Sequence, residues 1–183
     1  MQCWKSININ KHSDNQKKLF LSLLTMLLSF ITLYPLLSLK IMENTLYDDN
    51  LLLFFCGVIF IYPLHKLLHL VPLFFFKRGL NIKMEYDSLI HPVAIKLIDP
   101  VSKRTFLFAL TTPFVILTSV IIGCLFTFTE YAHYFTILLS IHIGLCVSDF
   151  ITLKNILQCP SNSFIEENDE GIKILIETNW QYL

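Results

Sequence analysis

Four long apolar runs dominate the sequence, and polar segments separate them. The runs cover about residues 19–39, 51–76, 105–128 and 134–157. A helix of about 20 apolar residues, rising about 1.5 Å per residue, crosses the hydrocarbon core of a bilayer. The pattern therefore predicts an all-α membrane fold with four transmembrane helices. Pro63 and Pro72 in the second run and Pro113 in the third each remove a helix hydrogen bond, so we expect kinks there.

Two polar segments carry signals for strands. Apolar and polar residues alternate in 80–87, and 91–100 predicts a second strand that Asp99-Pro100 ends. In the tail, residues 163–176 predict two short strands around an Asn-Asp-Glu-Gly turn. A small β-containing part is therefore expected outside the membrane.

The pattern divides the chain into three parts. Residues 1–18 form a polar N-terminal arm, residues 19–158 a four-span membrane domain, and residues 159–183 a tail with the predicted strand pair. Within the membrane domain, residues 77–105 form a long polar loop that carries the other two strands.

Basic residues predict how the bundle is oriented. The arm holds Lys5, Lys11, Lys17 and Lys18, and the 77–105 loop holds Lys77, Arg78, Lys83, Lys96, Lys103 and Arg104. The other two loops hold none apart from Lys40 at one border. Because cytoplasmic loops are enriched in Lys and Arg, we expect both termini and the long loop in the cytoplasm, in a multi-pass protein of the cell membrane.

The amino-acid composition is typical of a membrane protein. The chain is 54% hydrophobic and 15% charged, whereas soluble domains carry roughly 25% charged residues. Its net charge of zero does not indicate a nucleic-acid partner, and membrane lipid is the expected neighbour. Five scattered cysteines with no Cys-x-x-Cys predict unpaired structural thiols rather than a disulfide framework.

The second apolar run contains His65, Lys66 and His69. A charged side chain near the bilayer centre costs at least ~3 kcal/mol, and such residues usually mark function. His65 and His69 are four residues apart, so on a helix they share one face and can hold one ion. This is the spacing of the zinc peptidase motif His-Glu-x-x-His, with Lys66 at the position of the glutamate.

Asp149 in the fourth run lies at a matching depth. His65 and His69 lie twelve and eight residues before Lys77, which places them ~18 and ~12 Å from the cytoplasmic end. Asp149 lies ten residues before Cys159, or ~15 Å from the same side. Two imidazoles and a carboxylate, with a fourth position left to water, are the usual ligands of a catalytic zinc site.

Three neighbours of Asp149 are candidates for supporting roles. His142 lies seven residues earlier, ~10 Å further along the helix axis, so a ligand sphere of ~2 Å radius cannot easily include both. We expect His142 to line the cavity or to hydrogen-bond a neighbouring helix. Ser148 and Asn155 could support Asp149 from the same helix, and helix packing is the alternative role for both.

The order of these features resembles the putative zincin peptidase family of small bacterial membrane proteins, which is itself similar to site-2 proteases. The features are His65-x-x-x-His69 in the second span, the strand-bearing loop, Pro113, Ser148-Asp149, and Cys-Pro-Ser-Asn-Ser-Phe at 159–164 before a strand pair. The resemblance covers most of the chain after residue 50. It implies His65, His69 and Asp149 as metal ligands, zinc as cofactor, and a metallopeptidase that cleaves substrates in or near the membrane.

Lys66 departs from the pattern of that family. In metallopeptidases the glutamate accepts a proton from the attacking water, which a charged lysine cannot do. A divalent cation also repels an ammonium group. A neutral Lys66 could act as the base, so Lys66 stays a candidate catalytic residue of doubtful role.

Three interpretations of the site remain open at this point. The chain is an active peptidase, or it binds metal without peptidase chemistry, or it binds no metal and Lys66 and Asp149 form a structural ion pair. Opposite charges buried in a membrane commonly pair in this way. In the last case the protein would be a non-enzymatic membrane protein that binds a partner in the bilayer. A transporter is a weaker alternative, because buried His, Lys and Asp also suit proton relays.

Overall fold

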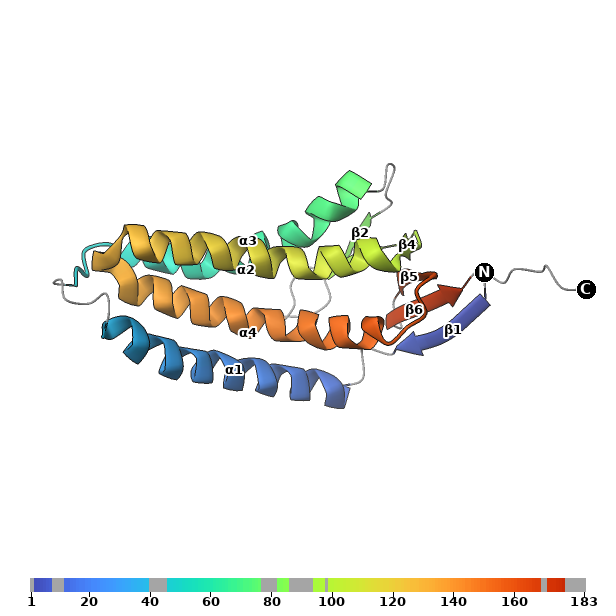
Figure 1. The fold of residues 1–183 in the computed structure, drawn as a ribbon, viewed down its shortest axis with the longest axis horizontal. Coiled ribbons are helices and arrows are strands. Elements are labelled where there is room, and N and C mark those ends of the chain that lie inside the picture. Colours follow the sequence, from blue (N-terminus) through green and yellow to red (C-terminus); the bar gives the residue numbers. More distant parts are fainter. Residues whose placement is uncertain are drawn as a thin grey trace, which may run out of the picture.

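Four long helices form the body of the protein. The computed structural model describes residues 2–7, 12–39, 46–76, 82–85, 94–97, 99–168 and 171–176. The helices are α1 (His12–Ser38), α2 (Leu51–Phe76), α3 (Lys103–Thr127) and α4 (Ala132–Leu157), and they run along the long axis of the molecule (Figure 1). Each is long and apolar enough to cross a membrane, which confirms the predicted four-helix architecture.

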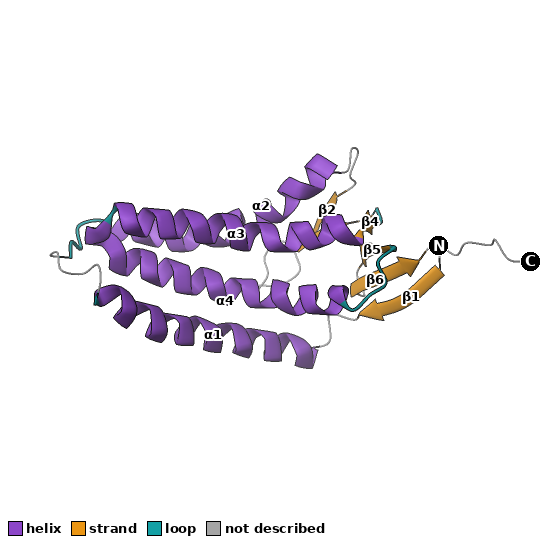
Figure 2. Cartoon of the chain, viewed as in Figure 1, coloured by secondary structure: helices purple, strands orange, loops and turns teal. Residues whose placement is uncertain are grey.

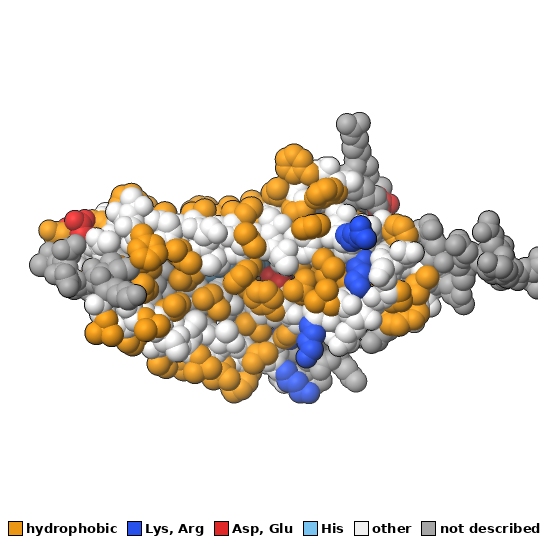
Figure 3. All heavy atoms as spheres, in the orientation of Figure 1, with side chains coloured by type: hydrophobic (Ala, Val, Ile, Leu, Met, Phe, Trp, Pro, Cys, Tyr) orange, Lys and Arg blue, Asp and Glu red, His pale blue; other side chains and the backbone are white. Residues whose placement is uncertain are grey.

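Large apolar side chains cover the outside of the helices. Exposed examples from the four helices are Phe20, Leu27, Phe55, Ile59, Phe75, Val120, Phe126 and Phe150. Figure 3 shows hydrophobic side chains over much of the visible face, with Lys and Arg gathered toward one end of the helices. Soluble monomers rarely expose contiguous apolar patches of more than a few hundred Å². The four apolar helices therefore suggest a membrane protein.

A small sheet lies at one end of the bundle (Figure 2). Its strands are β1 (Gln2–Ile7), β6 (Gly171–Ile176), β5 (Ser163–Asn168) and β4 (Val101–Ser102), in that order and all antiparallel. The predicted tail pair is β5 and β6, which meet where Asn168 pairs with Gly171. Gly171 has φ 131°, a conformation that residues with a Cβ rarely adopt. The middle of this turn, residues 169–170, lies outside the described residues.

The long loop contributes a separate hairpin. Strand β2 (Ile82–Glu85) pairs with β3 (Ala94–Leu97) in an antiparallel two-stranded sheet. Both predicted loop strands are therefore present, in shorter form than the segments 80–87 and 91–100.

Two strands of the larger sheet were not predicted. β1 lies in the N-terminal arm and pairs with β6 of the tail, and β4 at the end of the long loop pairs with β5. The arm, the loop and the tail consequently meet at one end of the bundle.

The two short loops meet at the opposite end. The Tyr47 N–H donates to the Glu130 carbonyl at 3.3 Å, and the Asn50 amide donates to the Tyr131 hydroxyl at 2.7 Å. Asp48 and Asp49 are exposed there. Acidic groups thus lie at the end away from the sheet, in loops that hold no basic residue apart from Lys40 at one border.

Proline residues do not end the helices. Pro63 and Pro72 both lie inside α2, which continues to Phe76. Figure 1 shows that the last part of α2, in green, points away from the bundle. Pro113 likewise lies inside α3. The predicted kink in α2 agrees with this change of direction.

Two apolar clusters pack the interior. One joins the helices to the sheet and consists of Leu70, Leu73, Val101, Phe106, Ala109, Ile156, Cys159, Ile165, Ile172 and Ile174. The other lies further along the bundle and is built from Ile61, Ile121 and Leu139. Along α2, His65 and His69 fall between Ile61 of the second cluster and Leu70 of the first. The polar residues of the interior therefore have apolar packing on both sides.

Helix α4 lies at the centre of the bundle and packs against the other three helices. Its contact with α1 depends on Gly144. A Cβ built on Gly144 would lie 2.9 Å from the Met26 Cβ and 3.0 Å from the Ser22 carbonyl oxygen. Small residues commonly allow such close approach between membrane helices.

We predict that Gly144→Ala destabilises the bundle, because the added methyl group forces α1 away from α4. Overpacking of this kind costs ~1–3 kcal/mol. Unfolding of the purified protein in detergent measures the effect. Gly123→Ala in α3 is the matched control, since a Cβ at Gly123 meets nothing within 4 Å. Equal stability of the two variants would contradict the close packing of α1 on α4.

Candidate metal centre

His65, His69 and Asp149 direct their polar atoms to one point between α2 and α4. The Nε2 atom of His65 lies 2.9 Å from Oδ2 of Asp149. The Nε2 atom of His69 lies 3.5 Å from the same oxygen and 3.2 Å from Nε2 of His65. The side chains are 3%, 15% and 13% exposed for His65, His69 and Asp149. The three residues predicted to share one depth are thus in contact.

The spacing of these three atoms suits a zinc ion. Zinc binds imidazole nitrogen and carboxylate oxygen at about 2.0–2.2 Å in tetrahedral geometry, which places neighbouring donor atoms ~3.3 Å apart. The observed distances of 2.9, 3.2 and 3.5 Å lie around that value. Two nitrogens and one oxygen also leave a fourth position free, as in catalytic zinc sites. The donor set therefore fits the metal.

The remaining ring nitrogens of both histidines have partners of their own. Nδ1 of His69 donates to the Ala109 carbonyl on α3 at 2.8 Å. Nδ1 of His65 lies 3.4 Å from Nε2 of His142 on α4. When both Nδ1 atoms carry the proton, both Nε2 atoms offer a lone pair toward Asp149. Hydrogen bonds of this kind fix the tautomer and orientation of metal-binding histidines.

Pro113 explains why the Ala109 carbonyl is available. In an α-helix the N–H of residue 113 would donate to the carbonyl of residue 109. Proline has no N–H, so this helix bond cannot form. The Ala109 carbonyl instead accepts the Nδ1–H of His69. A proline in one helix thereby orients a histidine in another.

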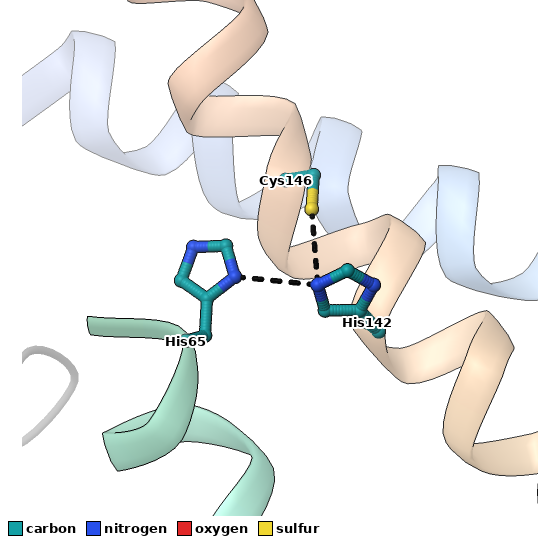
Figure 4. Close-up of side chains that lie close together, drawn as sticks. All are labelled: His65, His142 and Cys146. Atoms are coloured by element: carbon teal, nitrogen blue, oxygen red, sulfur yellow. Dashed lines mark hydrogen bonds between the residues drawn. The ribbon is translucent and has the colours of Figure 1, made fainter. Parts of the chain in front are cut away.

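His142 contacts the Nδ1 atom of His65 with its own Nε2, at 3.4 Å (Figure 4). It is fully buried, and its Nδ1 lies 3.4 Å from the Thr118 hydroxyl of α3. The hydrogen bond to α2 is one of the two roles expected for His142. Cys146 lies one turn further along α4, with Sγ 3.5 Å from Nε2 of His142. Sequence reasoning took Cys146 for a structural thiol, although its four-residue spacing from His142 places both on one helix face.

The sequence matches the model of a known protein family. Residues 58–164 match the model of the family described as "Putative zincin peptidase". The chain belongs to this family. The match covers more than half of the chain and includes His65, His69 and Asp149. The chain has no significant match among curated proteins or among solved structures.

The zincin family name refers to zinc peptidases with the motif His-Glu-x-x-His, and this chain has Lys66 after its first histidine. Lys66 is half-buried. Among the described residues it forms no ion pair or hydrogen bond, and Asp149 pairs with the two histidines instead. The alternative prediction of a Lys66–Asp149 ion pair is therefore wrong for this structure. One residue of α-helix turns the side-chain direction by about 100°, so Lys66 leaves α2 at a different angle from His65.

Within the part of the chain that the structure describes, Ser148 and Asn155 form no hydrogen bond to His65, His69 or Asp149. The Ser148 hydroxyl donates to the Leu145 carbonyl at 3.4 Å, one turn back along α4. The Asn155 carbonyl accepts from the Cys159 thiol at 3.4 Å. Both contacts stay within α4 or at its end.

We predict that Pro113→Ala weakens zinc binding ~10–100-fold, the usual effect of losing a partner of a metal-binding histidine. The alanine N–H would donate to the Ala109 carbonyl and compete with His69. Zinc titration of the purified metal-free protein measures the affinity. Pro35→Ala is the control, since Pro35 is exposed on α1 and far from these residues in the sequence. Unchanged affinity in Pro113→Ala would show that the Ala109 carbonyl does not orient His69.

Proposed function

We propose that this chain is an integral membrane zinc protein of the zincin peptidase family. His65, His69 and Asp149 hold the ion within the bilayer. The observation that carries the proposal is the convergence of three donor atoms from two apolar helices, at distances that suit zinc. Polar side chains at such depth are costly and usually serve a function.

The proposed protein crosses the cell membrane four times, with both termini and the long loop in the cytoplasm. The excess of Lys and Arg in the arm and the loop supports this orientation. The sheet that joins the arm, the loop and the tail supports a common side for all three. The metal site then lies between the outer loops and the cytoplasmic sheet.

When bound, zinc would polarise a peptide carbonyl and activate water, which is the chemistry of zinc peptidases. His65 and His69 would fix the position of the ion, and Asp149 would supply the negative charge. The reaction also needs a group that accepts a proton. Helices α2 and α3 contain no Asp or Glu, and Asp149 is the one in α4. A protonated Lys66 cannot take over this role.

The proposed activity is therefore binding of membrane-embedded or membrane-near peptide segments at a zinc site, with peptide hydrolysis slowed by the loss of the motif glutamate. In this respect the chain would resemble a site-2 protease with an altered catalytic motif. Membrane proteins are the proposed partners, because the site lies among helices whose outer surfaces are apolar.

Metal content tests the site directly. We predict about one zinc per chain in gently purified protein, and loss of that zinc in His65→Ala, His69→Ala and Asp149→Ala. Elemental analysis of protein purified in detergent gives the ratio. His133→Ala is a control, because His133 lies at the other end of α4 and contacts Asp48. Wild-type protein without metal would overturn the proposed function.

Lys66→Glu tests the missing proton acceptor. We predict that the variant keeps its zinc and folds as well as wild type, since Lys66 has no partner to lose among the described residues. It should cleave a membrane-peptide substrate faster, because general base catalysis contributes ~10²–10⁴-fold.

Lys66→Gln is the matched control, since it removes the charge without adding a base. Equal cleavage by Lys66→Glu and Lys66→Gln would contradict the assignment of position 66 to the base. A Lys66→Glu protein that loses its zinc would also contradict this assignment.

A further inference from the structure

A second group of metal-binding atoms lies beside the first and shares His65 with it. Nδ1 of His65, Nε2 of His142 and Sγ of Cys146 lie within 4.8 Å of one another, and all three residues are buried. Figure 4 shows His65 reaching from α2 toward His142 and Cys146 on α4. This group contains a thiol and no carboxylate, in contrast to the group with Asp149.

The distances between these atoms also suit a shared ion. Nδ1 of His65 lies 3.4 Å from Nε2 of His142, which lies 3.5 Å from Sγ of Cys146. Metal bonds of about 2.0–2.1 Å to nitrogen and about 2.3 Å to sulfur place tetrahedral donors ~3.3 and ~3.5 Å apart. The two observed distances match these values, and His65 Nδ1 and Cys146 Sγ lie within 4.8 Å of each other.

The donor types favour a soft ion. Thiolate ligands select soft metals such as Cu(I), and two histidines with one cysteine form the trigonal ligand set of copper sites. The charges agree as well: Cu(I) replaces the thiol proton, so Cu(I), one thiolate and two neutral imidazoles form a neutral complex and leave the net charge beside Asp149 unchanged. A neutral complex suits a buried position between apolar helices, where an uncompensated charge is costly.

We propose that His65, His142 and Cys146 form a second metal site, which binds Cu(I). Binding replaces the Cys146 S–H bond with a Cu–S bond, and the thiol proton leaves to solvent. The Nδ1 atom of His65 and the Nε2 atom of His142 supply lone pairs, so the His142 ring keeps its proton on Nδ1, next to the Thr118 hydroxyl at 3.4 Å.

Cu(I) and zinc exclude each other because both need His65. A neutral imidazole has one proton and one lone pair. With zinc, the lone pair of His65 is on Nε2 and the proton on Nδ1. With Cu(I), Nδ1 binds the metal and Nε2–H donates to Asp149 Oδ2, 2.9 Å away. Cu(I) would thus displace zinc and switch the first site off. This exclusion rests on the proposed function, whereas the Cu(I) site itself does not.

Competition with a chromophoric Cu(I) chelator tests the site on the purified, metal-free full-length protein in detergent, without oxygen. We expect one Cu(I) per chain, with a Cu–S bond visible by X-ray absorption. Cys146→Ser removes a direct ligand while keeping the size of the side chain. Losing a group that only hydrogen-bonds a metal ligand already lowers metal affinity by up to ~100-fold, so the Cu(I) affinity of this variant should fall by at least that factor. Cys124→Ser, a half-buried thiol of α3, is the matched control and should bind like wild type.

Two further variants separate this site from the zinc site. Asp149→Asn should lose zinc and keep Cu(I), and Cys146→Ser should lose Cu(I) and keep zinc. Wild-type protein that binds no Cu(I), or binds it as tightly as Cys146→Ser, would overturn the second site. Cu(I) binding in a protein that takes up no zinc would overturn the proposed function alone. Wild-type protein that holds both metals at once would overturn the exclusion.

Discussion

A buried histidine needs a partner for each of its two ring nitrogens, and this requirement organises the interior of the bundle. An unpartnered polar atom in an apolar setting costs ~1–3 kcal/mol. His65 meets the requirement with Asp149 on one side and His142 on the other. For His69, the partners are Nε2 of His65 on one side and the Ala109 carbonyl on the other. Helices α2, α3 and α4 are thereby held together by polar contacts as well as by apolar packing.

The position of α4 makes these contacts geometrically possible. It packs against the other three helices, and its inner face carries His142, Cys146 and Asp149 over about two turns. The two apolar clusters fix the helices above and below this polar level. Gly144 lies between His142 and Cys146 in the sequence and contacts α1 on the opposite side of α4. One short stretch of α4 therefore carries candidate metal-binding residues on one side and a close contact with α1 on the other.

The parts of the fold and site that depend on local sequence could be predicted, and the parts that depend on long-range pairing could not. The lengths of α2, α3 and α4 follow from the apolar runs, whereas α1 begins at His12 in the polar arm, seven residues before its predicted start. The meeting of His65, His69 and Asp149 follows from depth along two helices. Strand β1 escaped prediction because its pairing with β6 shifts register between Cys3 and Lys5, which breaks the alternation of polar and apolar residues. The role of the Ala109 carbonyl was not predicted, because no side chain marks a backbone acceptor. Pro113, four residues later, has no N–H and so leaves this carbonyl without its usual helix donor.

The absence of a Lys66–Asp149 ion pair has a physical reason in the lengths of the side chains. A histidine ring sits close to its helix, so its polar atoms must find partners at their own depth. A lysine has a flexible four-carbon stem, which lets its ammonium reach water from a buried backbone position. Lys66 is half-buried, in keeping with such a side chain. Equal depth of two backbone positions therefore predicts contact for His65 and Asp149, because both side chains are short, and does not predict it for Lys66.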